Sequence, residues 1–425
     1  MLDEIKDVFE KINRDRYIIG YDLNEQYAQV SYMRIDSNSP ETVSSVLGEE
    51  EFNIPIAVCK QGGRFLVGKE AVESGEHLTC DLYEKAKAGE TVFVDGEEYA
   101  ASDLLLLFIQ KSLYITPLMT TPEKIAGITI TLRDADVSMI GLLKNLPELI
   151  RVSQDKLIIV SYEEAFHYYM AFQPGELQNH NVLLCDGTSK KLITYRLERN
   201  KFSNPPVVMV DKKLHPEIDF NSTAISDTQL DDRFLSLSKS LCDSRVYSGV
   251  YLIGEGFYGD WCKESIKFLC RGRRVFKGNN LFSKGACLAG RERVLPSGID
   301  NKVKYLGNTN VKAEIGLKVL RMGVVNNIPL IEPSEQWFEV ENSTEVLLRE
   351  NPELEIYLKF MGNNAEKTAL FKLDNLPLTG GRMTRVEVSV SMPNESKVAI
   401  KVRDLGFGEI FTSTGLEWIE EMELV

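Results

Sequence analysis

The sequence predicts two α/β lobes followed by a β-sandwich, and three patterns support this fold class. A strand, an acidic turn and a second strand occur twice, about 165 residues apart. Helical and strand patterns alternate between and after these two units, which is typical of an α/β protein. Only β runs follow residue 305, separated by turns rich in Asn, Gly and Pro, as in a sandwich.

The repeated unit is a hairpin with an aspartate just beyond its first strand. The expected strands are residues 17–20 and 27–34 in the first hairpin, and 182–185 and 192–197 in the second. Asp22 begins the first turn and Asp186 begins the second. Because the same layout recurs at a fixed distance, we interpret the first 300 residues as a duplicated architecture.

The remaining patterns divide the chain into a first domain at 1–305 and a second at 310–425. The boundary falls near residues 300–312, because residues 301–310 are polar and weakly patterned. In the first domain we expect a packing helix at 4–13, helices at 101–113, 135–146 and 163–171, and strands at 125–132 and 156–160. In the second we expect strands at 337–340, 353–360, 368–373, 384–392 and 397–403.

Composition excludes several classes of function. The net charge of −14 opposes binding to nucleic-acid phosphates. No apolar run approaches the roughly 20 residues that span a bilayer, so we expect no membrane insertion. The N-terminus lacks the order of a signal peptide, which predicts a cytoplasmic protein. The seven cysteines are an odd number without a C-x-x-C pair, which indicates reduced, buried thiols.

The two acidic turns suggest a phosphate clamp. An aspartate on a tight turn can hold a metal ion through water, while backbone N–H groups of the turn point at phosphate oxygens. One such turn alone is more simply explained as a polar hairpin turn. Two turns that face each other, Asp22 in one and Asp186 in the other, favour the clamp.

A glycine-rich segment follows the expected strand at 250–253. Its sequence, from Gly254 to Gly259, fits G-x-G-x-x-G, the dinucleotide fingerprint. A dinucleotide site needs an acidic residue about 20 positions on, where this chain has Arg273, Arg274 and Lys277. Dinucleotide binding is therefore the minor alternative, and the other use of these glycines is close backbone approach to a nucleoside. The four histidines lack metal-ligand spacing, and no serine lies in a G-x-S-x-G elbow.

Taken in order, these segments resemble the DnaK-type heat-shock chaperones of the actin, sugar-kinase and heat-shock ATPase superfamily. The resemblance covers nearly the whole chain through short, degenerate motifs. These are residues 20–23 (first phosphate motif), 52–55 and 64–71, 161–169 (first connecting helix), 186–188 (second phosphate motif), 250–256 (adenosine motif), 279–286 (second connecting motif), and 371–373, 385–388 and 399–402 (sandwich strands).

This resemblance implies an actin-like nucleotide-binding domain with duplicated ribonuclease H-like halves, and a sandwich that binds a peptide or a protein partner. It also implies ATP or ADP with magnesium as cofactor, the metal being held through water by Asp22 and Asp186. The implied catalytic residues are Asp22, Lys85, Glu163 and Asp186, with Lys87 and Glu164 as alternatives. The implied nucleotide-binding residues are Gly20, Asn24, Gly187, Thr188, Gly254, Glu255, Gly256 and Gly285.

Departures from the family pattern leave two functional hypotheses open. Asn24, Glu25 and Gln26 replace Gly-Thr-Thr, which places a carboxylate toward the expected phosphates. Residues 197–226 are too few for the family's adenine-stacking subdomain, so tight nucleotide binding is not expected and the protein would be at most a weak ATPase. We also expect no helical lid after the sandwich, so a bound peptide would exchange quickly. One hypothesis is a chaperone-like protein with a degenerate ATP cleft. The other is a pseudo-ATPase scaffold or regulatory protein, which a cleft plugged by side chains such as Gln26 or Phe257 would favour.

Overall fold

A computed structural model describes residues 16–46, 50–75, 78–79, 81–200, 206–222, 225–243, 245–349, 351–361, 366–378 and 382–424. The chain divides into two compact units, Met1–Val303 and Lys304–Val425. The helix expected at residues 4–13 lies outside the described residues, as do His77 and Cys80. Among the described helices, none is long and apolar enough to cross a membrane.

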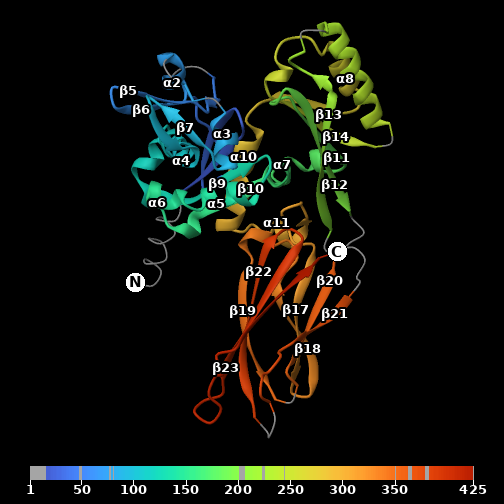
Figure 1. Ribbon diagram of the computed structural model, residues 1–425. Coiled ribbons are helices and arrows are strands. Elements are labelled where there is room, and N and C mark those ends of the chain that lie inside the picture. The colour runs from blue at the N-terminus through green and yellow to red at the C-terminus, as the bar shows by residue number, and fades with distance from the viewer. Residues whose placement is uncertain are drawn as a thin grey trace, which may run out of the picture. The chain divides into compact units, whose positions relative to one another are not determined.

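The first sheet of the N-terminal unit is mixed and has the strand order β10-β9-β1-β2-β3, of which Figure 1 labels β9 and β10. The central strand β1 pairs antiparallel with β2 and parallel with β9, and β9 pairs parallel with β10. The strands span Tyr17–Leu23 (β1), Tyr27–Arg34 (β2), Glu41–Thr42 (β3), Ile125–Leu132 (β9) and Leu157–Ser161 (β10), and β4 (Ile54–Pro55) also pairs with β2. Every residue of β9 is buried, which explains its nearly continuous apolar sequence.

The second sheet repeats this arrangement. Its strands have the order β15-β14-β11-β12-β13, again with an antiparallel β11–β12 hairpin and parallel β11–β14 and β14–β15 pairs. They span Asn181–Asp186 (β11), Lys191–Asn200 (β12), Val207–Asp219 (β13), Tyr247–Ile253 (β14) and Arg274–Gly278 (β15). Both expected hairpins are therefore present. Asp22 and Asp186 lie at the carboxyl ends of the two central strands. There Asp22 is paired with Thr131 of the parallel strand β9, and Asp186 with Ile253 of the parallel strand β14.

Helices cover both sheets of this unit. On the second sheet, α8 and α9 pack over a cluster that includes Phe234, Phe257 and Leu252, and Ser226 starts α8 with a capping box. The longer helices span Leu82–Ala88 (α3), Ala101–Leu113 (α4), Val137–Leu143 (α5), Tyr162–Ala171 (α7), Asp227–Cys242 (α8), Lys263–Leu269 (α9) and Leu281–Val294 (α10). The helix expected at 135–146 is shorter than predicted, because Asp136 caps its start and Lys144 ends it.

Short elements complete the N-terminal unit. Two small hairpins, β5 with β6 and β7 with β8, precede α4. They span Val58–Gln61 (β5), Arg64–Val67 (β6), Thr91–Val94 (β7) and Glu97–Ala100 (β8). The short helices are α2 (Lys69–Ser74), α6 (Leu146–Ile150) and α11 (Ile299–Lys302), and the 3₁₀ turns are η1 (Pro117–Thr120), η2 (Pro122–Lys124), η3 (Gln154–Lys156), η4 (Gly175–Gln178) and η5 (Glu255–Phe257).

The C-terminal unit is β-rich and contains two four-stranded antiparallel sheets, β18-β17-β20-β21 and β19-β22-β23-β24. Alternate side chains of β17 and β22 are buried, so each sheet turns one face inward. The strands span Lys304–Tyr305 (β16), Ala313–Arg321 (β17), Val324–Ile331 (β18), Glu341–Leu348 (β19), Glu353–Phe360 (β20), Glu366–Lys372 (β21), Thr384–Asn394 (β22), Lys397–Gly406 (β23) and Glu417–Glu423 (β24).

One expected strand of this unit is wrong. Residues 337–339 form a 3₁₀ turn, η6 (Trp337–Glu339), and the strand begins only at Glu341. The Trp337 backbone N–H donates to Thr309 while Glu339 N–H donates to Gln336, so long-range and local bonds together hold a turn. The apolar pair Trp337 and Phe338 had suggested a strand, although only burial of the Trp337 ring explains the apolar sequence.

Candidate functional site

The first acidic turn is held by its own asparagine. The Asn24 side-chain oxygen accepts hydrogen bonds from the backbone N–H groups of Gln26 (2.9 Å) and Tyr27 (3.0 Å). Its amide donates to the Tyr162 hydroxyl at 3.4 Å. Asn24 is buried. Its polar atoms therefore stabilise the turn between β1 and β2, which is the role that an Asx turn gives to asparagine.

The second acidic turn is tied to the glycine-rich segment. Asp186 accepts a hydrogen bond from the Thr188 backbone N–H (2.9 Å), and Gly187 donates to the Ile253 carbonyl (2.8 Å). The Gly187 carbonyl in turn accepts from the N–H of Gly256 at 2.9 Å. The residues after β11 and β14 thus form one hydrogen-bonded backbone junction.

The glycines of this junction allow two backbones to meet. A Cβ on Gly254 would lie 2.3 Å from the Thr188 nitrogen, and Gly254 has a φ of 89°. A Cβ on Gly256 would lie 2.6 Å from the Phe220 ring. The close approach that the sequence suggested for a ligand is therefore made here by the protein itself.

Gly20 and Gly285 have a similar packing role around α10. A Cβ on Gly20 would lie 2.2 Å from the carbonyl oxygen of Ser283, and one on Gly285 would lie 2.2 Å from the carbonyl oxygen of Ala165. Gly285 therefore marks the close crossing of α10 with α7, and Gly20 the crossing of α10 with β1. Both were expected to bind nucleotide, and the structure places Gly285 in α10 against α7 and Gly20 in β1 against α10.

Tyrosine hydroxyls and amides join the two acidic turns. Tyr27 donates from its hydroxyl to the Thr188 hydroxyl at 3.3 Å. Farther along, Asn53 donates to the Glu255 carboxylate at 3.0 Å and accepts from Gln29 at 2.7 Å. Thr188 and Tyr27 are both buried. The two turns thus face each other, with side chains between them.

Asp22 is buried and is held by a tyrosine. The Tyr162 hydroxyl donates to Asp22 at 2.5 Å. Burial raises the pKa of Asp22 to about 7, although the Tyr162 hydrogen bond and the Arg133 charge act in the opposite direction, and Asp186 and Glu25 raise it further. Burial also raises the pKa of Tyr162, so its hydroxyl stays protonated and remains a donor. Near neutral pH, Asp22 therefore holds a proton for much of the time.

Arg133 provides the positive charge of the site. It directly follows β9, and its guanidinium lies 3.7 Å from Asp186 and 3.8 Å from Glu25. The same group lies 5.6 Å from the centre of the Tyr162 ring. Asp186 is fully buried and Arg133 is 6% exposed. Burial alone would lower the pKa of Arg133, but the adjacent Asp186 raises it on balance, so the ion pair is maintained.

These residues do not fit a magnesium-bound phosphate. The Arg133 cation already pairs with Asp186, and burial raises the pKa of Asp22, so a magnesium ion would have to displace the arginine from one carboxyl group and a proton from the other. Glu25 adds a further negative charge on the same arginine. In the part of the chain that the structure describes, no group of three or more His, Cys, Asp or Glu side chains is arranged to hold a metal ion.

The expected glutamate and lysine residues have other environments. Glu163 is buried, and burial raises its pKa although the Lys212 ammonium lowers it. Glu164, also buried, lies 3.7 Å from Arg293. Lys87 pairs at 2.9 Å with Asp136, the residue that caps α5. Lys85 is half-buried two residues earlier in α3.

The principal residue that sequence reasoning missed is Arg133, together with Tyr27 and Tyr162. A signal for Arg133 was available, since it is a charged residue immediately after the buried strand at 125–132. Because β9 is parallel to β1, its carboxyl end meets the carboxyl end of β1 at Asp22. The tyrosines carried no comparable signal, because buried aromatic residues are common throughout this unit.

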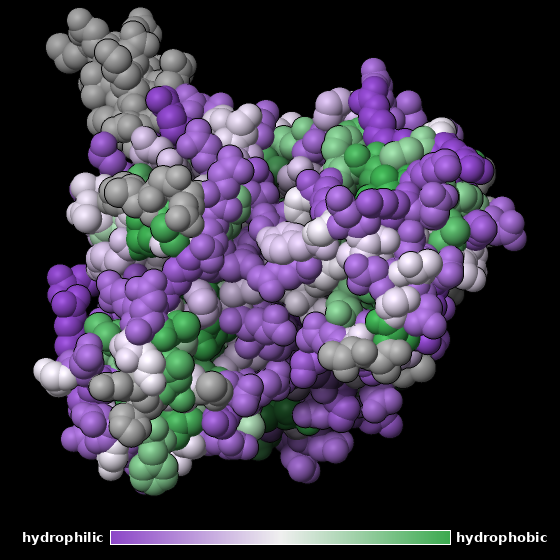
Figure 2. Space-filling view, turned by 90° about the horizontal axis from the view of Figure 1, so that it is seen from above, coloured by the Kyte–Doolittle hydropathy of each residue, from purple (hydrophilic) through white to green (hydrophobic). Residues whose placement is uncertain are grey.

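Beside the second turn lies a polar cavity of about 470 Å³. Its walls include Lys190, Glu255 and Asp227, with Trp261 and Tyr258 as aromatic side chains. Trp261 is held by a hydrogen bond from its indole N–H to the Gly256 carbonyl, at 2.9 Å. The face drawn in Figure 2 is mostly hydrophilic, with apolar side chains in separate patches.

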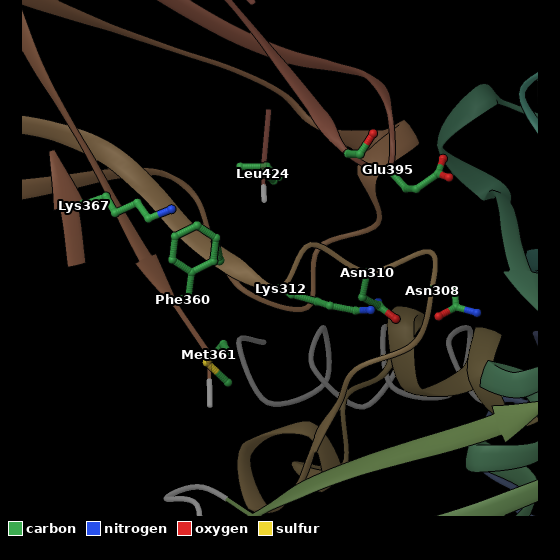
Figure 3. Close-up of a pocket in the computed structure, with 10 residues that line it drawn as sticks. Asn308, Asn310, Lys312, Phe360, Met361, Lys367, Glu395 and Leu424 are labelled. Carbon is green, nitrogen blue, oxygen red and sulfur yellow. The ribbon is translucent and has the colours of Figure 1, made fainter. Parts of the chain in front are cut away.

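A second cavity, of about 670 Å³, lies in the C-terminal unit (Figure 3). Lys367 places its ammonium 5.4 Å from the centre of the Phe360 ring, a cation–π contact. Lys312 and Glu395 supply charges of opposite sign, and Leu424 an apolar wall. Its size is that of cavities that hold a small molecule or a short peptide segment.

Two family models match the sequence. Residues 39–308 match the model described as "Family of unknown function (DUF5716) C-terminal", and residues 310–424 match "Domain of unknown function (DUF8552)". The first match covers more than half of the 425 residues. No curated protein matches the chain. The chemistry of the site therefore carries the functional interpretation.

Proposed function

This chain belongs to the family of unknown function DUF5716, and from its site we propose that it is an actin-like pseudo-ATPase. In this proposal the two α/β halves form a scaffold that does not turn over nucleotide. The β-rich C-terminal unit is a sandwich that binds a peptide or protein partner.

The repeated strand order supports the actin-like part of the proposal. Both sheets place an antiparallel hairpin beside two parallel strands in the order 3-2-1-4-5, counted along each half. Both halves also carry a buried aspartate in the last two residues of their first strand. A repeated order of this kind fits duplicated ribonuclease H-like halves, and the DnaK-like motif order agrees with it.

The observation that carries the loss of turnover is the Arg133–Asp186 ion pair beside the Tyr162–Asp22 hydrogen bond. The resemblance to the DnaK-type chaperones implies that both aspartates would hold a magnesium ion through water. Here each carboxyl group already has a protein partner, and both are buried. Opening the site to a hydrated metal and phosphates would separate a buried ion pair, whose disruption costs about 3–5 kcal/mol.

The C-terminal cavity supports partner binding. It combines the ammonium groups of Lys312 and Lys367 with the apolar surfaces of Phe360, Met361 and Leu424. Such a combination suits a peptide segment with an acidic and an apolar side chain.

Calorimetric titration with magnesium ATP tests the first part of the proposal. We expect no heat of binding at millimolar ATP and no release of phosphate. The matched variant is Asp186→Ala, which removes the carboxylate of the second turn. Micromolar binding in the wild type that disappears in Asp186→Ala would contradict the loss of nucleotide function.

A second candidate, a chaperone-like protein that keeps nucleotide as a ligand, is favoured by the 470 Å³ cavity. Gly187, Thr188 and Gly256 line that cavity together with Lys190. Titration with ADP and with adenosine separates the two candidates. Heat with either ligand that is weakened in Lys190→Ala or Trp261→Ala favours the second candidate, and absence of heat favours the scaffold.

A further inference from the structure

Strand β18 (Val324–Ile331) is an edge strand, and none of its side chains carries a charge that would oppose pairing with another strand. It lies at the end of its sheet, beyond β17. Its sequence, VVNNIPLI, contains no charged residue. The other edges described in this unit are charged: β19 has two glutamates, β21 has Glu366, Lys367 and Lys372, and β24 has four glutamates, Glu417, Glu420, Glu421 and Glu423. Charges on edge strands oppose pairing with another strand, and β18 lacks this protection.

The turn before β18 shows which backbone groups face outward. Arg321 and Val324 flank a two-residue loop, and both loop residues, Met322 and Gly323, have positive φ (53° and 80°). In such a type I′ turn the flanking residues are hydrogen-bonded to each other, so Val324 directs its N–H to β17. Alternation then turns the N–H groups of Val325 and Asn327 outward.

Pro329 agrees with this assignment. It falls in the same alternating set as Val325 and Asn327, the set that faces away from β17. A proline has no N–H to donate, so it is tolerated where the N–H would point away from the sheet. Among the residues that the structure describes, the outward N–H donors of this edge are therefore those of Val325 and Asn327.

Apolar side chains surround the same edge. Leu320, Met322, Val324 and Val325 are 74%, 96%, 63% and 65% exposed. Met322 occupies a left-handed backbone position for which Asn or Gly is the usual choice, so the turn itself does not require an apolar residue there. The tip thus combines outward backbone donors with an exposed apolar surface.

We propose that β18 is the interface between two copies of this chain, joined edge to edge as antiparallel strands around a two-fold axis near Asn326. Val325 of each copy then lies opposite Asn327 of the other, and their outward N–H and C=O groups form hydrogen bonds. The four apolar side chains of the hairpin tip lie beside the second copy. This inference does not depend on the proposed function of the N-terminal unit.

Charge favours a second copy as the occupant. The chain has a net charge of −14, so two copies repel each other over most of their surfaces, and a neutral strand is where that repulsion is least. The charges that flank β18 are opposite in sign, Arg321 before it and Glu332 after it. Antiparallel pairing brings the Arg321 end of one copy toward the Glu332 end of the other, whereas self-pairing of β24 would align glutamates.

The test is the mass of the full chain in solution, measured by sedimentation and light scattering over micromolar concentrations. We expect the wild type to have twice the 48.0 kDa of one chain. Val325→Lys adds a charge to the edge, and Asn327→Pro removes one outward N–H without affecting the bonds to β17. Both variants should be monomers. The matched control is Ile419→Lys, which places the same side chain on β24 at a residue that is 69% exposed, and it should remain a dimer.

Three results would overturn the proposal. A monomeric wild type would leave the edge to a strand from a different protein. A dimer that persists in both Val325→Lys and Asn327→Pro would place the interface elsewhere on the chain. Equal loss of the dimer in Ile419→Lys would show that the lysine acts through general charge rather than through β18. Circular dichroism of each variant verifies that the fold is retained.

Discussion

Replacement of Asp22 by asparagine should stabilise the N-terminal unit, and more so at high pH. The amide keeps the shape of the side chain and an oxygen that accepts the Tyr162 hydrogen bond. It removes the charge that burial disfavours. The wild type carries that charge in the folded state only above the raised pKa of Asp22, about 7.

The linkage between protonation and folding gives the direction and the size of this pH-dependent change in stability. Because the folded pKa is raised from 3.8 to about 7, the stability that Asp22 contributes is complete below the unfolded pKa and is lost as the pH rises to the folded pKa. Each pKa unit corresponds to about 1.4 kcal/mol, so the full loss is about 4 kcal/mol at most. Between pH 5 and pH 8 the advantage of Asp22→Asn should grow by about 3 kcal/mol.

Denaturant titration at pH 5, 6, 7 and 8, read by hydrogen exchange and mass spectrometry, measures this difference. Peptides from β1 and β9 report the N-terminal unit separately from the C-terminal unit. A difference that does not change with pH would refute the buried, protonated state of Asp22. If Asp22→Asn became less stable relative to the wild type as the pH rises, Asp22 would instead be a carboxylate with a favourable partner, such as a metal ion.

Three further predictions concern packing and charge. Arg133→Ala leaves Asp186 buried without its cation and should lower the free energy of unfolding by about 3–5 kcal/mol in denaturant titrations. Adding Asp186→Asn to this variant should restore part of the lost stability. No loss of stability in Arg133→Ala would show that the ion pair is not formed. Gly285→Ala should destabilise the protein by about 1–3 kcal/mol because its Cβ would meet the Ala165 carbonyl. Gly141→Ala has open space in helix α5 and should stabilise the protein by about 0.5–1 kcal/mol. Thermal melts that give both changes the same sign would contradict the close crossing of α7 and α10. Burial raises the pKa of Asp404, but hydrogen bonds from the Thr384 hydroxyl and from the Thr414 and Gly406 N–H groups lower it on balance. Asp404→Asn should therefore reduce stability at neutral pH, and the difference from the wild type should shrink as the pH falls below the pKa of the unfolded state. Urea titrations at pH 3 and pH 7 measure this difference, and an equal loss at both would argue against an ionised Asp404.

Much of the fold could be predicted from local patterns. The helix at 101–113 and the strands at 125–132 and 353–360 have the expected bounds, because their periodicity and burial agree with their final state. Both hairpins with their aspartates were also predictable, since strand and turn signals act within a few residues. The turn at Trp337 was not, because a bond to Thr309 from a distant segment helps to hold it.

The candidate site divides in the same way. The sequence by itself indicated that Asp22 and Asp186 stand where the first strand of each hairpin meets its turn, and the structure places both within the last residues of those strands rather than beyond them. Only the tertiary structure decided what those carboxyl groups contact. Arg133 is 111 positions from Asp22 and 53 from Asp186 in the sequence, and Tyr162 is 140 positions from Asp22. Parallel pairing of β9 with β1, and the packing of α7 under α10, bring these side chains to the aspartates. Burial then sets the pKa of Asp22, and burial is a property of the assembled unit and not of any local segment.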